Sequence, residues 1–406
     1  MGAKVTSSLV MVTVALLGVH VAEVQIDPEN RELLQFGYNA ALQGHPPQSG
    51  YAFYYRNKPE FIQTNWTLRL AIAPTYLDSE LGMSGILGPD THLGIGLAGG
   101  GYADSYPEIR LGTFLPRESF VGYGGEFSTS IYHLFNPGSQ IPLNGILRGA
   151  FHYSTYQEDS ETDRNFKVPD NRETFSVKTG LRWGGREPTL YPSLAMELSV
   201  WYDGQFRAGG TGLYGYDDRE VEAWTHVFWG EALLAYTFPK SNQRFEVSLT
   251  LGTAINPDRF SAFRLGALLP LVSEYPLSIP GYYYQEISAR NFALISANYL
   301  VPLDKEFHWN INVNGAAAAV DYLAGLEQPG NWNSGVGAGV LYRRSSWRVM
   351  TGYAYGFNAI RSSGRGAHSI GILLQLDWSR AKQDIFTPTT PDMWRGVQRM
   401  FGIFGQ

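Results

Sequence analysis

The stretch that decides the fold is Trp66-Thr67-Leu68-Arg69-Leu70-Ala71-Ile72-Ala73-Pro74-Thr75-Tyr76. Its apolar residues stand at every second position, and the positions between them carry threonine, arginine or alanine. A period of two predicts a β-strand with one apolar face. Read as a single strand, this stretch would extend about 33 Å. Tilted by about 40°, it would span roughly 25 Å, the height of the apolar band around an outer-membrane barrel.

The same alternation recurs along the chain, in segments that begin at Phe175, Leu194, Phe245, Trp309, Trp347 and His368. A soluble β-sandwich also alternates, with its apolar face turned inward. Here, however, the polar faces carry glycine, alanine, serine and asparagine, and the aromatic residues stand at strand ends, as at a bilayer interface. We therefore predict an all-β fold, a transmembrane antiparallel β-barrel over residues 49–378. Roughly 14 to 16 strands are expected, with 16 favoured because such single-chain barrels use even numbers.

The composition of the 406-residue chain agrees with this prediction and excludes several classes of protein. The chain has 46 glycines and 25 tyrosines, only 17% charged residues and no cysteine. The absence of cysteine excludes disulfide scaffolds, cysteine-ligated metal centres and thiol catalysis. A net charge of −6 gives no electrostatic case for nucleic-acid binding. We expect no cofactor and no metal.

The two ends of the chain carry separate signals. Residues 1–22 resemble a secretory signal, because Lys4 precedes an apolar run that is too short to cross a bilayer comfortably. Residues 23–48 are predicted to form a short periplasmic helical segment, with Asp27 and Pro28 at its start and Leu34 and Tyr38 on one face. Residues 379–406 form a tail with an amphipathic helix. That helix could lie at the membrane interface, plug the barrel, or simply dock on its surface.

Isolated charges on the polar faces of the strands are the candidate lumen residues. They could set ion selectivity or hold an inserted loop, and a mutually neutralised network is the alternative. These residues are Arg69, Lys178, Arg182, Glu197, Glu246 and Arg264. The glycines of Gly94-x-Gly96-x-x-Gly99 formally match a dinucleotide motif, but no helix is indicated after them. The histidines are scattered, and no hydrolase, metalloprotease or nucleotide-binding motif occurs. We therefore expect no catalytic residues.

The last third of the chain resembles a known superfamily, the outer-membrane barrels of the BamA and TamA assembly factors and of the two-partner translocators such as FhaC. The matching fragments keep the family's order. They are Phe263-Arg264-Leu265-Gly266, Ile279-Pro280-Gly281-Tyr282, Ala297-Asn298-Tyr299-Leu300-Val301-Pro302-Leu303, Gly335–Tyr342, Tyr353–Asn358 and His368–Gly371, and Phe53–Asn57 is similar to the opening strands. The resemblance implies a long loop that folds into the lumen, with its tip at Ile279, Pro280, Gly281 and Tyr282.

Two departures from the family pattern limit what the resemblance implies. In the family an arginine at the loop tip pairs with an aspartate on a neighbouring strand. Here Pro280 replaces the arginine and Asn314 stands where the aspartate is expected, with Arg264 a second candidate docking residue. This exchange would remove the charged lock and leave a fixed turn, held by packing and hydroxyl bonds of the tyrosines. The short residue 23–48 segment also leaves no room for POTRA domains, so the chain resembles the subset that lacks them.

These observations favour a non-enzymatic outer-membrane barrel of a Gram-negative-type bacterium, acting in protein or lipid assembly or transport. The alternatives are a passive or plugged pore for small solutes, and an enzyme or adhesin that acts through long external loops. Outer-membrane lipid and lipopolysaccharide are the expected partners, with a periplasmic chaperone or accessory protein as a further candidate. The acidic residues 157–173 could bind divalent cations that bridge lipopolysaccharide, although a solvated external loop is the simpler interpretation.

Overall fold

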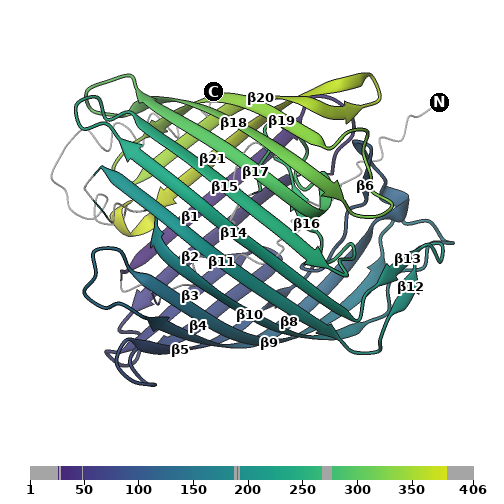
Figure 1. Cartoon of the computed structure of the whole chain (residues 1–406), viewed down its shortest axis with the longest axis horizontal. Coiled ribbons are helices and arrows are strands. Elements are labelled where there is room, and N and C mark those ends of the chain that lie inside the picture. Colours follow the sequence, from purple (N-terminus) through teal and green to yellow (C-terminus); the bar gives the residue numbers. More distant parts are fainter. Residues whose placement is uncertain are drawn as a thin grey trace, which may run out of the picture.

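The computed structural model describes residue 26 and residues 29–47, 49–186, 190, 193–267 and 277–381. These residues form a closed antiparallel barrel of 16 strands, which confirms the predicted fold and the favoured strand number (Figure 1). The wall strands are β1 (Arg31–Ala41), β2 (Ser49–Pro59), β3 (Trp66–Ala73), β4 (Tyr76–Met83), β5 (Thr91–Gly100), β8 (Phe120–Leu134), β9 (Leu143–Glu158), β10 (Arg172–Gly185), β11 (Leu194–Arg207), β14 (Trp224–Thr237), β15 (Arg244–Ile255), β17 (Ile287–Pro302), β18 (Trp309–Tyr322), β19 (Trp332–Arg343), β20 (Trp347–Arg361) and β21 (Gly364–Asp377).

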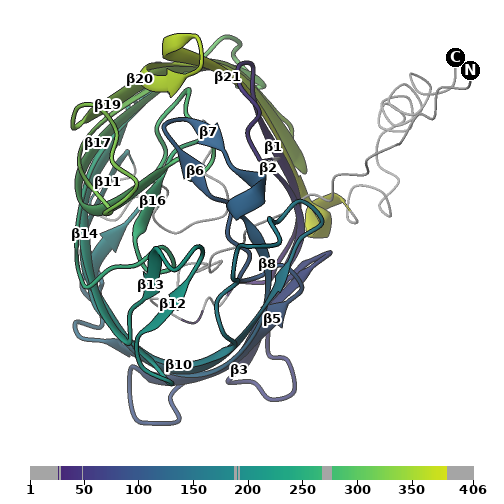
Figure 2. The same ribbon diagram turned by 90° about the vertical axis from the view of Figure 1, so that its right-hand side faces the viewer.

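Each wall strand pairs with its neighbours in sequence, and the first strand pairs with the last. The β1–β21 seam holds nine consecutive pairs, from Leu33 opposite Asp377 to Ala41 opposite Ser369. Figure 2, which looks into the barrel, shows this continuous wall around a lumen. Because the sheet closes on itself, no strand of the wall presents an unpaired edge.

The alternation in the sequence separates a lipid-facing side from a lumen side. On β15, Phe245, Leu249 and Leu251 are 40%, 42% and 50% exposed. A soluble protein rarely exposes such a row of large apolar side chains to water. The glycines at 94 and 96 lie on β5, facing the lumen, where a side chain would meet Glu80 or Ser128. The outer face is therefore apolar over the whole wall, and the lumen is polar.

The two ends of the barrel differ in the length of their connections. We call the end with short connections the turn end. At this end β1 begins and β21 ends. The four long connections at the other end, residues 101–119, 159–171, 208–223 and 256–286, together form what we call the cap. They contain β6 (Ile109–Arg110), β7 (Thr113–Phe114), the 3-10 turn η1 (Pro116–Glu118), β12 (Gly212–Tyr214), β13 (Arg219–Val221) and β16 (Phe263–Leu265). Figure 2 shows these small hairpins across the barrel opening.

Two local predictions are wrong. The segment predicted as a helix forms β1, so the barrel begins at Arg31 and not at residue 49, because this segment pairs with both β2 and β21. The stretch from Trp66 to Tyr76 is not one strand. It turns back at Pro74 and Thr75, and β3 pairs with β4 from Ala73 opposite Tyr76 onward. A proline that cannot donate to a strand ladder fits this tight turn.

The remaining predictions about the ends fall largely outside the described residues. This holds for the signal over residues 1–22 and for the amphipathic helix of the tail. A single helical turn follows β21 at Trp378–Ala381. In the part of the chain that the structure describes, no helix has the length and apolar character needed to cross a bilayer.

Candidate functional site

The connection between β15 and β17 is described at residues 256–267, which form β16 beside β17, and at residues 277–286, which lie in the lumen before β17 begins. The tip of this loop lies against the inner faces of β19 and β20. Gly281 has a φ of +87°, and a side chain there would overlap the backbone of Gly356, so only glycine fits. On the other side, a side chain at Gly335 would overlap the carbonyl of Pro280. Glycines on the wall and in the tip thus allow the two backbones to touch.

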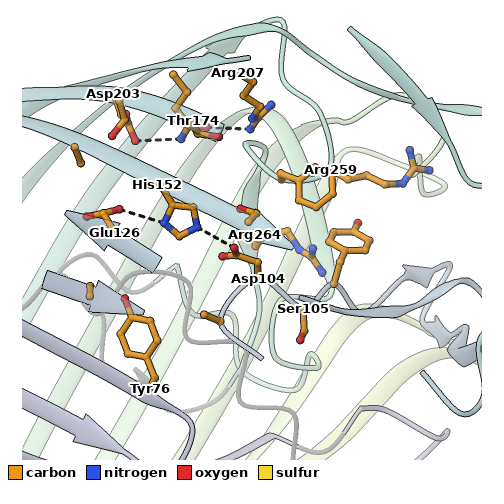
Figure 3. A pocket seen from close by; sticks show the side chains of 18 of the residues that line it. Tyr76, Asp104, Ser105, Glu126, His152, Thr174, Asp203, Arg207, Arg259 and Arg264 are labelled. Carbon is orange, nitrogen blue, oxygen red and sulfur yellow. Dashed lines mark hydrogen bonds and ion pairs between the residues drawn. The ribbon is translucent and has the colours of Figure 1, made fainter. Parts of the chain in front are cut away.

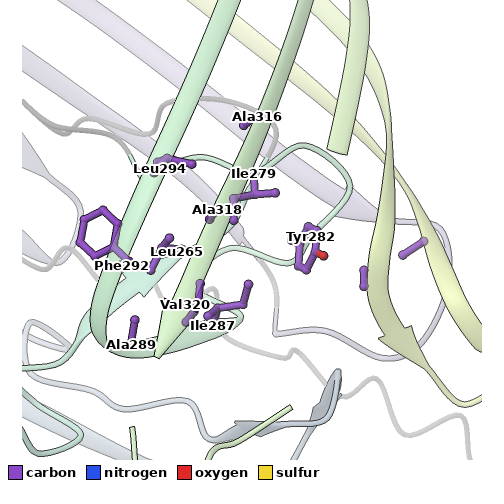
Figure 4. Close-up of a cluster of buried hydrophobic side chains, with 12 residues drawn as sticks. Leu265, Ile279, Tyr282, Ile287, Ala289, Phe292, Leu294, Ala316, Ala318 and Val320 are labelled. Carbon is purple, nitrogen blue, oxygen red and sulfur yellow. The ribbon is translucent and has the colours of Figure 1, made fainter. Parts of the chain in front are cut away.

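An apolar cluster packs the loop onto the wall. Ile279 and Tyr282 are fully buried in it, with Leu265 of β16 (Figure 4). The wall contributes small and branched side chains, namely Ile287, Ala289, Phe292 and Leu294 of β17, Ala316, Ala318 and Val320 of β18, Ala359 of β20 and Ala367 of β21. Burial of so many apolar groups, each contributing about 0.8 kcal/mol per methylene, favours a docked loop.

An ion pair also fixes the loop, and sequence reasoning missed it. The guanidinium of Arg361, at the end of β20, donates to both carboxylate oxygens of Glu286 at 2.7 and 3.0 Å. Both side chains are almost completely buried. The guanidinium also lies 3.7 Å from the ring centre of Tyr283, whose hydroxyl donates to the carbonyl of Gln43. A charged lock is therefore present, with the acid on the loop and the base on the wall.

The two docking residues predicted from the sequence, Arg264 and Asn314, lie elsewhere than the Glu286–Arg361 pair. Arg264 lies on β16, within the loop, and donates to the carbonyls of Gln285 and Pro107. Asn314 lies on β18 opposite Asn298, and no hydrogen bond of its side chain with the tip is found among the described residues. The hydroxyl of Tyr282 donates instead to Asn333, at 3.2 Å. The predicted tip itself, residues 279–282, lies in the lumen.

Buried charges tie three of the four connections of the cap together. Glu108 is completely buried and accepts hydrogen bonds from Arg110 at 2.8 Å and Arg259 at 3.1 Å. Arg219 lies 3.6 Å from the same carboxylate and pairs with Glu118. Burial alone would raise the pKa of Glu108, but the nearby arginine charges and hydrogen bonds outweigh it and lower the pKa below its usual value. The carboxylate stays ionised and holds three loops together.

Aromatic side chains fill the cap beneath these charges. Phe120 is the centre of the cluster, in contact with rings of all four connections or the strand ends beside them. Its neighbours include Tyr106, Tyr156, Phe166, Tyr214 and Phe260. The rings pack the four connections against one another and against the strand ends with apolar surface.

Five of the six predicted lumen charges lie along the wall from β3 to β15, and each has a charged or aromatic partner, whereas Arg264 lies on β16. Arg69 lies 3.8 Å from Asp78 and 4.0 Å from Glu80, and Arg182 pairs with Glu197 at 2.7 Å. Glu246 lies 3.5 Å from Arg244. Lys178 lies above the rings of Trp201 and Trp229, 5.3 and 5.6 Å from their centres. These pairs fit the neutralised network that was the alternative to an ion-selective path.

A polar cavity of about 250 Å³ lies inside the barrel, below the cap. His152 of β9 lines it, and the ring nitrogens of this residue face Asp104 at 2.8 Å and Glu126 at 3.6 Å (Figure 3). Glu126 also pairs with Arg148 at 2.8 Å. The histidine lies between two carboxylates, and none of the described histidines is hydrogen-bonded to a serine.

The chain before β1 enters the turn end of the lumen. Ile26 packs beside Tyr132, Ile146, Trp201 and Trp229, all on the lumen side of β8, β9, β11 and β14. The side-chain amide of Asn57 donates to the carbonyl of Glu29 at 2.6 Å, which holds the segment against β2. These residues form a small apolar cluster on the inner face of β8, β9, β11 and β14.

One group of potential metal ligands lies in the connection between β17 and β18. Oxygen and nitrogen atoms of Asp304, Glu306 and His308 lie within 4.8 Å of one another. The carboxylate of Asp304 already accepts hydrogen bonds from the backbone amides of His308 and Trp309. This geometry is that of a turn stabilised by an aspartate.

Comparison with known proteins gives similarity at the level of the fold. No family model and no curated protein matches the sequence. Among solved structures, CdiB from Acinetobacter baumannii matches with a TM-score of 0.59 at 10% identity, over 87% of this chain and 60% of that one. A BamA from Haemophilus ducreyi lacking POTRA domains 1–3 matches with a TM-score of 0.55 at 11% identity, over 86% of this chain and 70% of that one. CdiB from Escherichia coli matches with a TM-score of 0.56 at 10% identity, over 86% of this chain and 63% of that one. The chain thus has the barrel fold of these proteins and spans less than two thirds of the length of either CdiB.

Proposed function

We propose that this chain, which has the fold of the CdiB and BamA barrels, is a non-enzymatic outer-membrane barrel that acts in protein or lipid assembly or transport. The wall supports the location, because its outer face is apolar and its lumen polar. The turn end would face the periplasm and the cap the exterior, since outer-membrane barrels keep short turns inside and long loops outside.

One observation carries the proposal, which is the loop 256–286 docked in the lumen by a buried ion pair. A passive channel needs no such loop. A barrel that must open for a large client needs a lumen loop that is held in place and can also be released. The Glu286–Arg361 pair meets both needs, because the loop is joined to β20 only through non-covalent contacts. The pair has its acid on the loop and its base on β20, at positions other than Pro280 and Asn314, where the family pattern would place its charges.

The experiment for the lock is a charge exchange measured by planar-bilayer conductance. Glu286→Arg should place two guanidinium groups together in a buried site, undock the loop and increase the open-state current. The double exchange Glu286→Arg and Arg361→Glu should restore the low current of the original chain. Glu246→Arg, which changes a partly exposed lumen carboxylate away from the loop, is the matched control. Unchanged current in both Glu286→Arg and the single exchange Arg361→Glu would refute a loop-held closed state.

The client is tested separately, by crosslinking the full chain in outer membranes and identifying what is attached. Assembly factors, chaperones or unfolded outer-membrane polypeptides are the expected products. Glu286→Arg should change the yield of these crosslinked products, because this exchange undocks the loop. Thorough crosslinking that recovers no such partner would favour the second candidate, a plugged pore for small solutes, which the polar cavity under the cap supports.

The proposal of a non-enzymatic role rests on the histidines. His152 faces carboxylates on both sides, and His133 and His226 are bonded to the hydroxyls of Thr91 and Tyr202. A phospholipid-hydrolysis assay with purified barrel tests this directly, and turnover would overturn it. An adhesin is less favoured because the long connections pack on one another across the mouth.

A further inference from the structure

Two arginines face one another at the turn end of the barrel. Arg343 ends β19 and Arg348 lies near the start of β20, and the two residues are directly opposite in this antiparallel pair. Both side chains are exposed. Like charges at directly opposite positions destabilise a sheet. The stability of the wall therefore gives no reason for this pair.

Both arginines stand on the lumen face of the wall. On β20, Arg348 shares its face with Met350, which packs against a small buried cluster inside the barrel. On β19, Arg343 shares its face with Gly335, which touches the lumen loop at Pro280. Side chains two positions apart on a strand lie on the same face. A ligand would therefore reach the two guanidinium groups through the turn-end mouth of the lumen and not through the bilayer.

Neither arginine forms an ion pair with a carboxylate of the described residues. Arg343 donates from Nε to the carbonyl of Phe307 at 2.7 Å. Arg348 donates from Nε and Nη2 to the side-chain oxygen of Gln375, at 3.0 and 2.6 Å. A guanidinium carries further N–H donors in a planar fork, so both groups keep donors for a ligand. The arginines at the lumen face of β3 and β10, by contrast, already lie beside carboxylates.

Two further arginines extend the positive charge along the same edge. Arg344 lies in the connection after β19, and Arg380 follows β21 and donates to the carbonyl of Ser345 in that connection, at 3.4 Å. Both side chains are exposed, and among the described residues only Arg380 has an acidic partner, Asp377 at 3.2 Å. This excess of positive charge stands out in a chain with a net charge of −6. The group, which we call the arginine edge, consists of Arg343, Arg344, Arg348 and Arg380.

We propose that the arginine edge binds an acidic polypeptide segment that approaches the lumen from the turn end. The inference rests on the proposed function and names the chemical class of the client. Guanidinium and carboxylate groups form paired, charge-assisted hydrogen bonds, and several such pairs along one linked chain strengthen one another. The charges are spread over the ends of β19, β20 and β21. That spread suits a chain with several carboxylates better than a single small anion, and positive charge at the mouth also attracts an acidic chain before contact.

The test is fluorescence anisotropy with the full chain in phosphatidylcholine nanodiscs and labelled peptides of equal length, in which serine alternates with glutamate, glutamine or lysine. Only the glutamate peptide should bind saturably, and its binding should weaken as the salt concentration rises. Absence of saturable binding, or equal binding of the glutamine peptide, would overturn the proposal. The conductance increase expected of Glu286→Arg does not depend on this outcome, so failure of the inference is distinguishable from failure of the proposed function.

A double substitution locates the site. Arg343→Gln with Arg348→Gln should weaken binding of the glutamate peptide about 3- to 30-fold, through the loss of two exposed charge pairs. Arg290→Gln with Arg365→Gln is the matched control, because it removes the same net charge from exposed arginines at the cap end of β17 and β21. Equal weakening by the two double variants would show that net charge alone attracts the peptide and would refute the site. Unchanged binding in the first double variant would refute it as well.

Two competitors separate the peptide from other anions. Inorganic phosphate at an equal concentration of negative charge should not displace the glutamate peptide, and displacement would assign the arginine edge to a small anion. Phosphatidylglycerol in place of phosphatidylcholine should reduce peptide binding by the same factor in the original chain and in the Arg343 and Arg348 double variant. A reduction confined to the original chain would assign the arginine edge to a lipid headgroup and overturn the proposal.

Discussion

At the residue scale, one carboxylate holds much of the cap. Glu108→Gln should leave Arg219 and Arg259 without their shared buried counter-charge, which costs about 3 kcal/mol or more in comparable sites. The connections 101–119 and 208–223 should become sensitive to trypsin while the wall stays folded. Asp163→Asn is the control, because its partner Arg117 is largely exposed and such pairs contribute about 0–1 kcal/mol. Equal protease resistance of the Glu108 variant and the original chain would contradict the prediction.

The pKa of Glu108 gives a prediction for the dependence on pH. The folded pKa lies below the ordinary value of 4.5, so this carboxylate stabilises the cap fully at pH values above about 4.5. The stabilisation is lost as the pH falls through the lower, folded value. Protection of the connections 101–119 and 208–223 against proteolysis should therefore stay constant from neutral pH to about 4.5 and fall only in stronger acid. A loss of this protection that begins near neutral pH would show that another group controls the cap.

Which residues dock the loop could be predicted only in part. The tip at residues 279–282 is predicted through the resemblance to the outer-membrane barrel superfamily, and its proline and glycine agree with a fixed turn. The Glu286–Arg361 pair could not be predicted from the sequence, because the two residues meet only through the path of the loop across the lumen. Neither residue has a local feature that distinguishes it from other charges in a barrel of low charge content.

At the scale of the elements, the packing of β1 against β2 limits the size of the side chains that fit on the lumen side of β1. A side chain at Gly37 would overlap the ring of Tyr51, which lies in a small buried cluster with Ala354 and Leu373. Gly37→Val should destabilise the barrel by about 1–3 kcal/mol through overpacking. The temperature at which the folded band disappears in detergent electrophoresis measures this loss. Gly149→Val, at a β9 position with open space around it, should leave that temperature unchanged.

The two wrong predictions of elements have the same physical origin. Leu34 and Tyr38 fit one face of a helix, but Leu34, Phe36 and Tyr38 fit one face of a strand equally well. The stretch after Trp66 keeps its period of two through Pro74, and periodicity alone does not show where a strand turns back. In both cases the pairing partner decides the structure, and β21 lies at the other end of the sequence from β1. The long strands β10, β11, β15 and β20 carry enough repeats to be predicted correctly.

At the scale of the whole molecule, the closed seam can be tested by crosslinking. The chain has no cysteine, so a pair introduced at Phe36 and Leu374, which are opposite one another in β1 and β21, has no competing thiol. Phe36→Cys with Leu374→Cys should form a disulfide under mild oxidation and change mobility in denaturing electrophoresis. Phe36→Cys with Ile370→Cys is offset by four residues, about 13 Å along the strand, and should not. Equal yields in the two pairs would show that the seam has no fixed register.

The seam also has a consequence for the order in which the molecule is made. Strands β2 to β20 can each add to a neighbour already synthesised, but β1 can complete its ladder only after β21 exists. Contacts between residues so distant in sequence form late and slowly, because the chain entropy of closing the ring must be overcome first. Until then the growing sheet has two open edges with lipid-facing apolar rows beside them, which are prone to aggregate. The biogenesis of this barrel should therefore be limited by a single last event, the meeting of its first strand with its last.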